Sequence, residues 1–153
     1  MPLHQETRVL PYTAEQMYAV VADIESYPQF LPWCSKLIVR KREMVGASEF
    51  VEAEMFISYH ALQERYVSGV KLDPAARTIE ACHVEGPFRR LDTRWRFVPM
   101  DTGSEVHFLI DFAFKNAILS AVANVGFGYV ANRMAQAFVD RAKSLYGSDD
   151  LEK

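Results

Sequence analysis

The sequence predicts an α+β domain in which a curved antiparallel sheet of about seven strands wraps around a long C-terminal helix. Residues 35–115 alternate between apolar and polar side chains with a period of two, as half-buried strands do. Residues 116–146 instead carry apolar side chains at helical spacing. The chain has 153 residues, of which 50% are hydrophobic and 24% charged, which suits one domain with its own core. We therefore expect a single domain over residues 1–147 and a short acidic tail at 148–153.

Short elements are expected ahead of the main sheet. The alternation over residues 7–11 predicts an opening strand. Thr13 is a suitable N-cap for a helix over residues 14–22, and Gln16 occupies the position that closes a capping box. The two prolines of residues 23–34 leave room only for short helical turns. We therefore expect two short helices after the first strand.

Turn signals divide the sheet region into strands of about 8 to 12 residues. These signals are Val45-Gly46-Ala47, Asp73-Pro74, Glu85-Gly86-Pro87 and Asp101-Thr102-Gly103. Alternation is clearest in the last two strands. The side chains expected on their inner face are Leu91, Thr93, Trp95, Phe97, Val106, Phe108, Ile110, Phe112 and Phe114. Hairpin-length turns between consecutive strands predict an antiparallel meander.

The C-terminal segment from 116 to 146 would be about 45 Å long as one continuous helix. Its second half is amphipathic, with Val130, Met134, Phe138, Ala142 and Leu145 on one stripe. Its first half carries no charge between Lys115 and Arg133, so loops, a ligand or a membrane surface must cover it. Gly126 and Gly128 loosen the helix there, which suits a gate or a kink.

Charge and composition argue against several classes of function. A net charge of -3 gives no general attraction to phosphate backbones, and we expect no DNA partner. The two basic clusters are expected to be solvated strand faces. They comprise Lys36, Arg40, Lys41 and Arg42, and then Arg89, Arg90, Arg94 and Arg96.

Neither the cysteines nor the histidines form a recognisable site. Cys34 and Cys82 are too far apart in sequence for a zinc motif and are expected to be free thiols. The histidines are isolated, so we expect no metal site; they are His4, His60, His83 and His107. Residues 126–131 match a dinucleotide-binding fingerprint, but no strand precedes them and too little chain follows.

One polar feature lies within an otherwise apolar strand pattern. Alternation places Glu64 and Tyr66 on one face of a strand. If that face is concave, the two residues supply polar groups to an apolar pocket, and a buried carboxylate there is suited to acid-base chemistry. If the strand register differs by one residue, Glu64 lies in water instead.

No secretory or organelle-targeting signal is recognised at the N-terminus. We expect the protein inside a cell, most simply in a bacterial cytoplasm. The uncharged stretch over 117–131 suggests transient contact with the inner membrane.

Three stretches carry a family resemblance. They are Asp23-Ile-Glu-Ser-Tyr-Pro-Gln-Phe-Leu-Pro-Trp-Cys34, Gly86-Pro-Phe-Arg-Arg-Leu-Asp-Thr-Arg-Trp-Arg-Phe97 and Phe112-Ala-Phe-Lys-Asn-Ala-Ile-Leu119. With the order of elements, they make the chain resemble the START-like superfamily of lipid-transfer proteins and polyketide cyclases, which has the helix-grip fold. Within it, the chain looks like the coenzyme Q-binding proteins and the related ribosome association toxins.

The resemblance implies a non-catalytic protein that binds ubiquinone or a similar polyprenyl lipid and supports respiration, with no other cofactor. The residues implied as one wall of the cavity are Tyr27, Pro28, Phe30, Leu31, Pro32 and Trp33. The turn with Pro87 and Phe88, and the strand leading to Trp95, would line the mouth or floor. The helix with Ile118, Val122 and Val125 would be the lid. Of the aromatics, we favour Tyr27, Phe30 and Trp33 as ligand contacts, and expect Trp95 and Phe97 to pack in the core.

Two alternatives stay open. The first is a ribosome association toxin that binds the large ribosomal subunit and blocks subunit joining, as such relatives are described to do. The second is an enzyme of the cyclase or aromatase type that uses Glu64.

Overall fold

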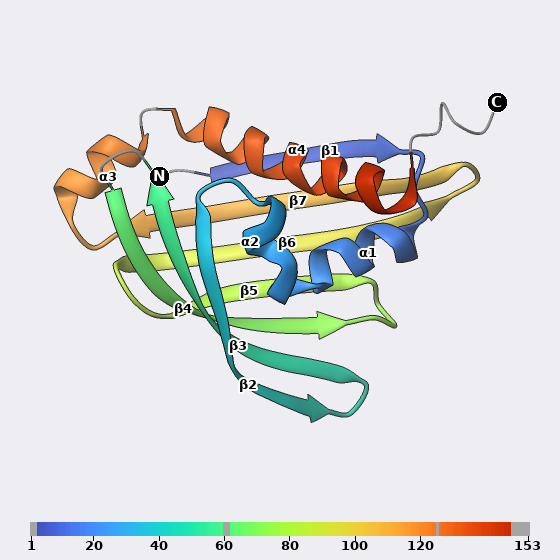
Figure 1. Cartoon of the computed structure of the whole chain (residues 1–153), viewed down its shortest axis with the longest axis horizontal. Coiled ribbons are helices and arrows are strands. Elements are labelled where there is room, and N and C mark those ends of the chain that lie inside the picture. Colours follow the sequence, from blue (N-terminus) through green and yellow to red (C-terminus); the bar gives the residue numbers. More distant parts are fainter. Residues whose placement is uncertain (1–2, 60–61, 125, 148–153) are drawn as a thin grey trace.

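A computed structural model describes residues 3–59, 62–124 and 126–147 of the chain (Figure 1). In chain order its elements are β1 (Leu3–Leu10), α1 (Ala14–Ala22), η1 (Ile24–Ser26), α2 (Tyr27–Phe30), β2 (Cys34–Val45), β3 (Ser48–Tyr59), β4 (Leu62–Asp73), β5 (Thr78–Glu85), β6 (Phe88–Met100), β7 (Gly103–Phe114), α3 (Ala117–Asn124) and α4 (Phe127–Tyr146). This order confirms the predicted fold class and the short helices after the first strand.

The sheet has seven strands in the order β1-β7-β6-β5-β4-β3-β2, and every neighbouring pair is antiparallel. Strands β2 to β7 form the predicted meander, while β1 closes onto β7 and forms the edge opposite β2. The inner face of the sheet buries its apolar side chains with those of α1 and α4 in one cluster. Figure 1 shows α3 and the β2–β3 turn at opposite ends of the molecule.

The local signals at α1 are confirmed. Thr13 caps the helix, because its Oγ1 accepts a hydrogen bond from the Gln16 backbone N–H at 3.0 Å. The Gln16 side chain accepts a bond from the Thr13 N–H at 2.9 Å, which completes the capping box. The helix then turns Met17 and Val21 into the core, where each is at most 1% exposed.

The alternation predicted for the last two strands is also confirmed. Trp95 and Phe97 are buried on β6, while Arg94 and Arg96 on the other face are exposed. Strand β1 begins at Leu3, four residues before the predicted start. The inward-facing residues of this early part are His4, Glu6 and Arg8, which are polar or charged. The inward-facing apolar residues that normally mark a strand in a sequence are therefore missing there. Glu6 contacts both His4 and Arg8, which satisfies these polar groups.

The C-terminal segment differs from the single helix that its spacing predicts. It is divided into α3 and α4, and Gly126 between them has a φ of 80°. That left-handed conformation is accessible to glycine and ends helical continuity. On α4 the core contact comes from Phe138 and several alanines, while Leu145 is 50% exposed, contrary to its place on the predicted stripe. None of the helices within the described ranges is both long and apolar enough to cross a membrane.

Candidate ligand-binding site on the concave face

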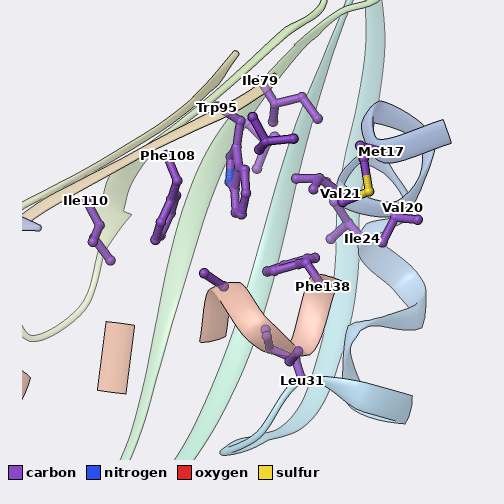
Figure 2. Packing of buried hydrophobic residues seen from close by; sticks show 14 of the residues in the cluster. Met17, Val20, Val21, Ile24, Leu31, Ile79, Trp95, Phe108, Ile110 and Phe138 are labelled. Atoms are coloured by element: carbon purple, nitrogen blue, oxygen red, sulfur yellow. The ribbon is translucent and has the colours of Figure 1, made fainter. Parts of the chain in front are cut away.

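An aromatic cluster fixes α4 above the sheet. Phe138, which is 3% exposed, contacts the rings of Tyr27, Phe30 and Trp95 edge-on, with centroid distances of 5.4, 5.4 and 5.0 Å. Figure 2 shows Phe138 on the sheet side of α4, facing Trp95. Trp95 in turn stacks on Phe108 at 4.3 Å and is 8% exposed. As expected, Trp95 packs in the core.

The segment expected to form one wall divides into buried and exposed positions. Leu31 is buried, Phe30 and Pro32 are half-buried, and Pro28 is exposed. The Tyr27 hydroxyl donates a hydrogen bond to the Val21 carbonyl at 2.5 Å, and burial raises the pKa of Tyr27 well above its ordinary range. This hydroxyl is therefore occupied by the backbone, which makes Tyr27 a structural contact between α1 and α2 as well as a candidate for the wall.

Trp33 has an unusual backbone for a bulky residue. Its φ is 68°, in the left-handed region that glycine and asparagine adopt more easily. Its carbonyl accepts a hydrogen bond from the Ser58 N–H at 2.9 Å, which ties the start of β2 to the end of β3. The side chain is half-buried. Strain at such a residue is often associated with function, which keeps Trp33 among the candidate ligand contacts.

Strand pairing decides the orientation of Glu64. On β3 and β4, Ile57 pairs with Glu64 and Met55 pairs with Tyr66, so both β4 side chains lie on one face. That face is concave, because Val70, further along the same face, belongs to the core cluster. Both Glu64 and Tyr66 are half-buried. Of the two arrangements that the sequence allows, the structure therefore has the one in which Glu64 faces the interior.

The Tyr66 hydroxyl lacks a strong acceptor among the described residues. It approaches the Met55 sulfur at 3.2 Å, and a thioether is a weak acceptor. Burial raises the pKa of Tyr66 well above its ordinary range, so the phenol stays protonated. A neutral hydroxyl in this position is able to donate to, or accept from, a ligand.

His83 joins this region, although the sequence suggested only an isolated strand residue. It lies on the concave face of β5, in phase with buried Ile79. Its Nε2 is buried and has no hydrogen-bond partner within the described part of the chain. The Gly86 turn closes over it: a Cβ at Gly86 would lie 3.1 Å from this nitrogen and 2.6 Å from Cβ of Tyr66. Only a glycine fits there. Gly86 is therefore the one feature of the sequence that indicates a close approach of this turn to Tyr66 and His83.

Phe88 links these residues to the end of the sheet. Its ring lies edge-on to Tyr66 at 5.2 Å and to His83 at 5.5 Å, and it stacks on Phe114 at 4.7 Å. Phe88 itself is 7% exposed. The neighbouring Pro87 is half-buried, and its carbonyl accepts a hydrogen bond from the Lys115 N–H at 2.8 Å. The predicted mouth residues Pro87 and Phe88 are thus brought next to Tyr66.

The predicted lid is described only in part. Ile118 on α3 is 73% exposed and Tyr129 near the start of α4 is 63% exposed. Val125 lies outside the described residues, and so does the side chain of Val122, whose backbone belongs to α3. The structure therefore places Ile118 at the surface, away from any contact with the aromatic cluster.

The outer face of the sheet has mixed charge. Four of the eight members of the basic clusters meet acidic partners: Arg40 contacts Glu54, Lys41 contacts Glu43, Arg42 contacts Glu25 and Glu49, and Arg90 contacts Asp111. A depression of about 260 Å³ lies on this face beside Arg94 and Arg96. It is also lined by Glu80, so its charge is not uniformly positive.

Two histidines are less isolated than expected. The His4 ring lies 2.6 Å from the Glu6 carboxylate, and His107 lies 3.0 Å from Glu105. Each pair is two residues apart on one strand, a spacing that brings side chains to the same face. Across the ranges that the structure describes, no group of three or more potential ligands gathers as a metal site. Both cysteines are free thiols, Cys34 buried and Cys82 exposed.

Comparison with known proteins identifies the family. Residues 10–139 match the model of the polyketide cyclase / dehydrase and lipid transport family. The chain belongs to this family. A family member from Rickettsia prowazekii, the ribosome association toxin RatA, is 35% identical over 92% of this chain and 96% of its own length. The mitochondrial coenzyme Q-binding protein COQ10 homolog B of Xenopus laevis is 32% identical over 97% of this chain. This chain spans 61% of that relative's length.

A solved structure in the same family has the same architecture. The 18 kDa protein CC1736 of Caulobacter crescentus is 36% identical and superimposes with a TM-score of 0.80. The match covers 97% of this chain and all of the other. The family fold, with its concave face under the C-terminal helix, is therefore shared by proteins whose names refer to different functions.

Proposed function

We propose that this chain binds ubiquinone or a similar polyprenyl lipid between the concave face and its C-terminal helices, without chemical turnover. It would then act as a carrier or chaperone for the lipid in respiration and quinone synthesis. The observation that carries the proposal is the set of half-buried apolar and aromatic side chains on this face, next to a few polar groups. They include Phe30, Met55, Tyr66, Phe127 and Met134. The coenzyme Q-binding relative supports this ligand class.

The magnitude of lipid binding fits such a surface. Burial of apolar area contributes roughly 25 cal/mol per Å². Burying about 300 Å² of an isoprenoid tail therefore contributes about 7.5 kcal/mol, which corresponds to affinity near the micromolar range before ordering costs. Aromatic side chains such as Phe30 and Phe127 also offer ring faces or edges to a quinone ring.

Exchange of such a lipid requires contact with a membrane. The exposed side chains of Ile118 and Tyr129 lie in the uncharged stretch between Lys115 and Arg133. Both cations are exposed and form no ion pair within the described ranges. An apolar tip flanked by free cations is complementary to an anionic bilayer surface, where the apolar side chains enter the interface and the cations meet headgroups.

The first test is to identify what the protein carries. Protein purified from a bacterial host that makes ubiquinone would be extracted with organic solvent and analysed by mass spectrometry. We expect near-stoichiometric quinone, reduced in a Trp33→Ala variant and retained in Arg94→Ala, which changes only the outer face. Protein that is free of lipid and fails to take up added quinone would contradict the proposal.

A second candidate function is ribosome association. The relative from Rickettsia prowazekii supports it through its name and its full-length match. Among the described residues, however, four of the eight cations of the basic clusters are paired with carboxylates, which weakens attraction to RNA. Co-sedimentation with large ribosomal subunits that weakens steeply with salt, together with an absence of bound lipid, would favour this function over the first.

A third candidate is catalysis at Glu64, which the concave orientation of its side chain makes worth testing. A cyclase-type reaction needs a positioned acid or base in contact with the substrate. The Glu64→Gln variant would abolish such turnover, whereas it would leave binding of a quinone largely intact. Turnover of a polyketide-like substrate by the wild type alone would replace the non-catalytic proposal.

A further inference from the structure

The concave face holds a small polar region, of which the sequence pattern indicated Tyr66 but not His83. It consists of the side chains of Tyr66 and His83: the Cβ of Tyr66 and Nε2 of His83 lie against the turn at Gly86, and the Tyr66 hydroxyl reaches the Met55 sulfur. We infer that these two groups bind the polar head of the ligand, a neutral carbonyl or hydroxyl oxygen, while the apolar remainder lies on the aromatic side chains around them. This inference rests on the proposed lipid-binding function and names the groups that select the head of the lipid.

A buried polar atom requires a hydrogen-bond partner. His83 Nε2 has none among the described residues. Leaving such an atom unpaired is unfavourable, and most buried polar atoms in proteins are paired. The Tyr66 hydroxyl has only the Met55 sulfur, so it too retains hydrogen-bonding capacity. Oxygen atoms on the head of a ligand would satisfy these needs.

The fold holds the two side chains in fixed positions. The Gly86 backbone has a φ of 144° and packs against Tyr66 and His83 so closely that a Cβ would collide with Tyr66. The ring of Phe88 is edge-on to both residues, at 5.2 and 5.5 Å. Side chains packed from two sides are preorganised, which lowers the entropic cost of binding.

The two side chains are both uncharged, which restricts the charge of the head group that they can bind. Burial lowers the pKa of His83, the Lys115 cation lowers it further, and the Glu85 carboxylate opposes both. His83 is therefore neutral at pH 7 and presents one N–H and one lone pair. Together with a protonated tyrosine, it forms an uncharged pair that suits a neutral oxygen. A carbonyl or hydroxyl group on a ring meets this requirement.

The test compares two probes with equal tails. Decylubiquinone carries ring oxygens, whereas 1-phenyldecane has a ring without oxygen, and binding of each would be measured by calorimetry. We expect His83→Phe and Tyr66→Phe each to weaken decylubiquinone binding about three- to tenfold, since one hydrogen bond is worth roughly 0.5–1.5 kcal/mol. Binding of 1-phenyldecane should change less than twofold. His107→Phe, which alters a histidine on the outer face, serves as the matched control and should affect neither probe.

The possible outcomes are distinguishable. If the wild type binds neither probe, the proposed function fails and this inference fails with it. If the wild type binds both, and the two variants bind decylubiquinone as tightly as the wild type, only the inference is wrong. An equal loss for both probes would also overturn it, because such a loss reflects altered packing. Thermal unfolding of each variant, with His83→Gln as a polar replacement, separates a folding defect from a loss of recognition.

Discussion

The rings of Phe138 on α4 and Trp95 on β6 meet edge to face, with their centroids 5.0 Å apart. This contact joins the C-terminal helix to the middle of the sheet. Tyr27 and Phe30 also contact Phe138, so α2 is held by the same side chain. The anchored part of the C-terminal segment is therefore α4, whereas Ile118 on α3 remains exposed.

We expect Phe138→Ala to destabilise the protein by about 3–5 kcal/mol, because the substitution opens a cavity among three aromatic rings. Urea unfolding monitored by circular dichroism would measure the change. Tyr129→Ala on the same helix is the control; its side chain is 63% exposed, so a change within about 0.5 kcal/mol is expected. Similar losses in the two variants would contradict the anchoring role of Phe138.

A second prediction compares two turn glycines. Gly86→Ala forces a Cβ to 2.6 Å from that of Tyr66 and adopts an unfavourable φ, so we expect a loss of roughly 2–4 kcal/mol. Gly46 also has a positive φ, but its added Cβ would meet nothing within 4 Å. Gly46→Ala should therefore cost only about 1 kcal/mol. Equal costs in denaturant unfolding would show that the Gly86 turn tolerates a side chain.

The backbone of Trp33 gives a prediction that separates stability from binding. Asparagine tolerates its φ of 68° better than tryptophan does, so Trp33→Asn relieves strain of order 1–3 kcal/mol while it removes some packing. We expect a free energy of unfolding close to that of the wild type, together with reduced uptake of quinone. A loss of stability well above about 2 kcal/mol, with uptake intact, would instead assign Trp33 a structural role.

Membrane contact is testable by flotation with vesicles that contain phosphatidylglycerol and phosphatidylcholine. Ile118→Glu places a carboxylate at the apolar tip, and we expect about tenfold weaker binding. Met44→Glu is the matched control, because Met44 is 64% exposed beside the β2–β3 turn, at the end of the molecule away from α3 (Figure 1). Lys115→Glu should weaken binding to anionic vesicles only. Equal binding by the Ile118 and Met44 variants would exclude this tip as the contact.

Acid should destabilise the protein partly through His83. Its pKa in the folded state lies below the ordinary value of 6.5, because burial and then Lys115 disfavour the imidazolium. The unfolded chain therefore binds a proton first as pH falls below about 6.5, and the stability that His83 contributes above that pH is lost. Urea unfolding between pH 7.5 and 5 should show a smaller decline in His83→Phe than in the wild type. Equal declines in the free energy of unfolding of the two proteins would contradict the lowered pKa of His83.

Local interactions explain what the sequence determined by itself. The capping box of Thr13 and Gln16, the turns, and the alternation that buries Trp95 and Phe97 all depend on side chains a few positions apart. Such patterns follow from the periods of helices and strands. They were sufficient for the order of elements, the antiparallel sheet and the position of the core. The family resemblance named Tyr27 and Phe30 only as residues of the cavity wall, and it did not indicate their contact with Phe138.

Only the tertiary structure decided the polar part of the candidate site. The burial of Val70 in the core identified the concave face of β4, on which Glu64 also lies, and the closure of the Gly86 turn brought His83 beside Tyr66. The break at Gly126 likewise divided a segment whose spacing suits one helix. These outcomes depend on strand register and on close approaches between distant parts of the chain. Periodicity within a single strand carries no information about either, because it does not specify which strand will lie alongside.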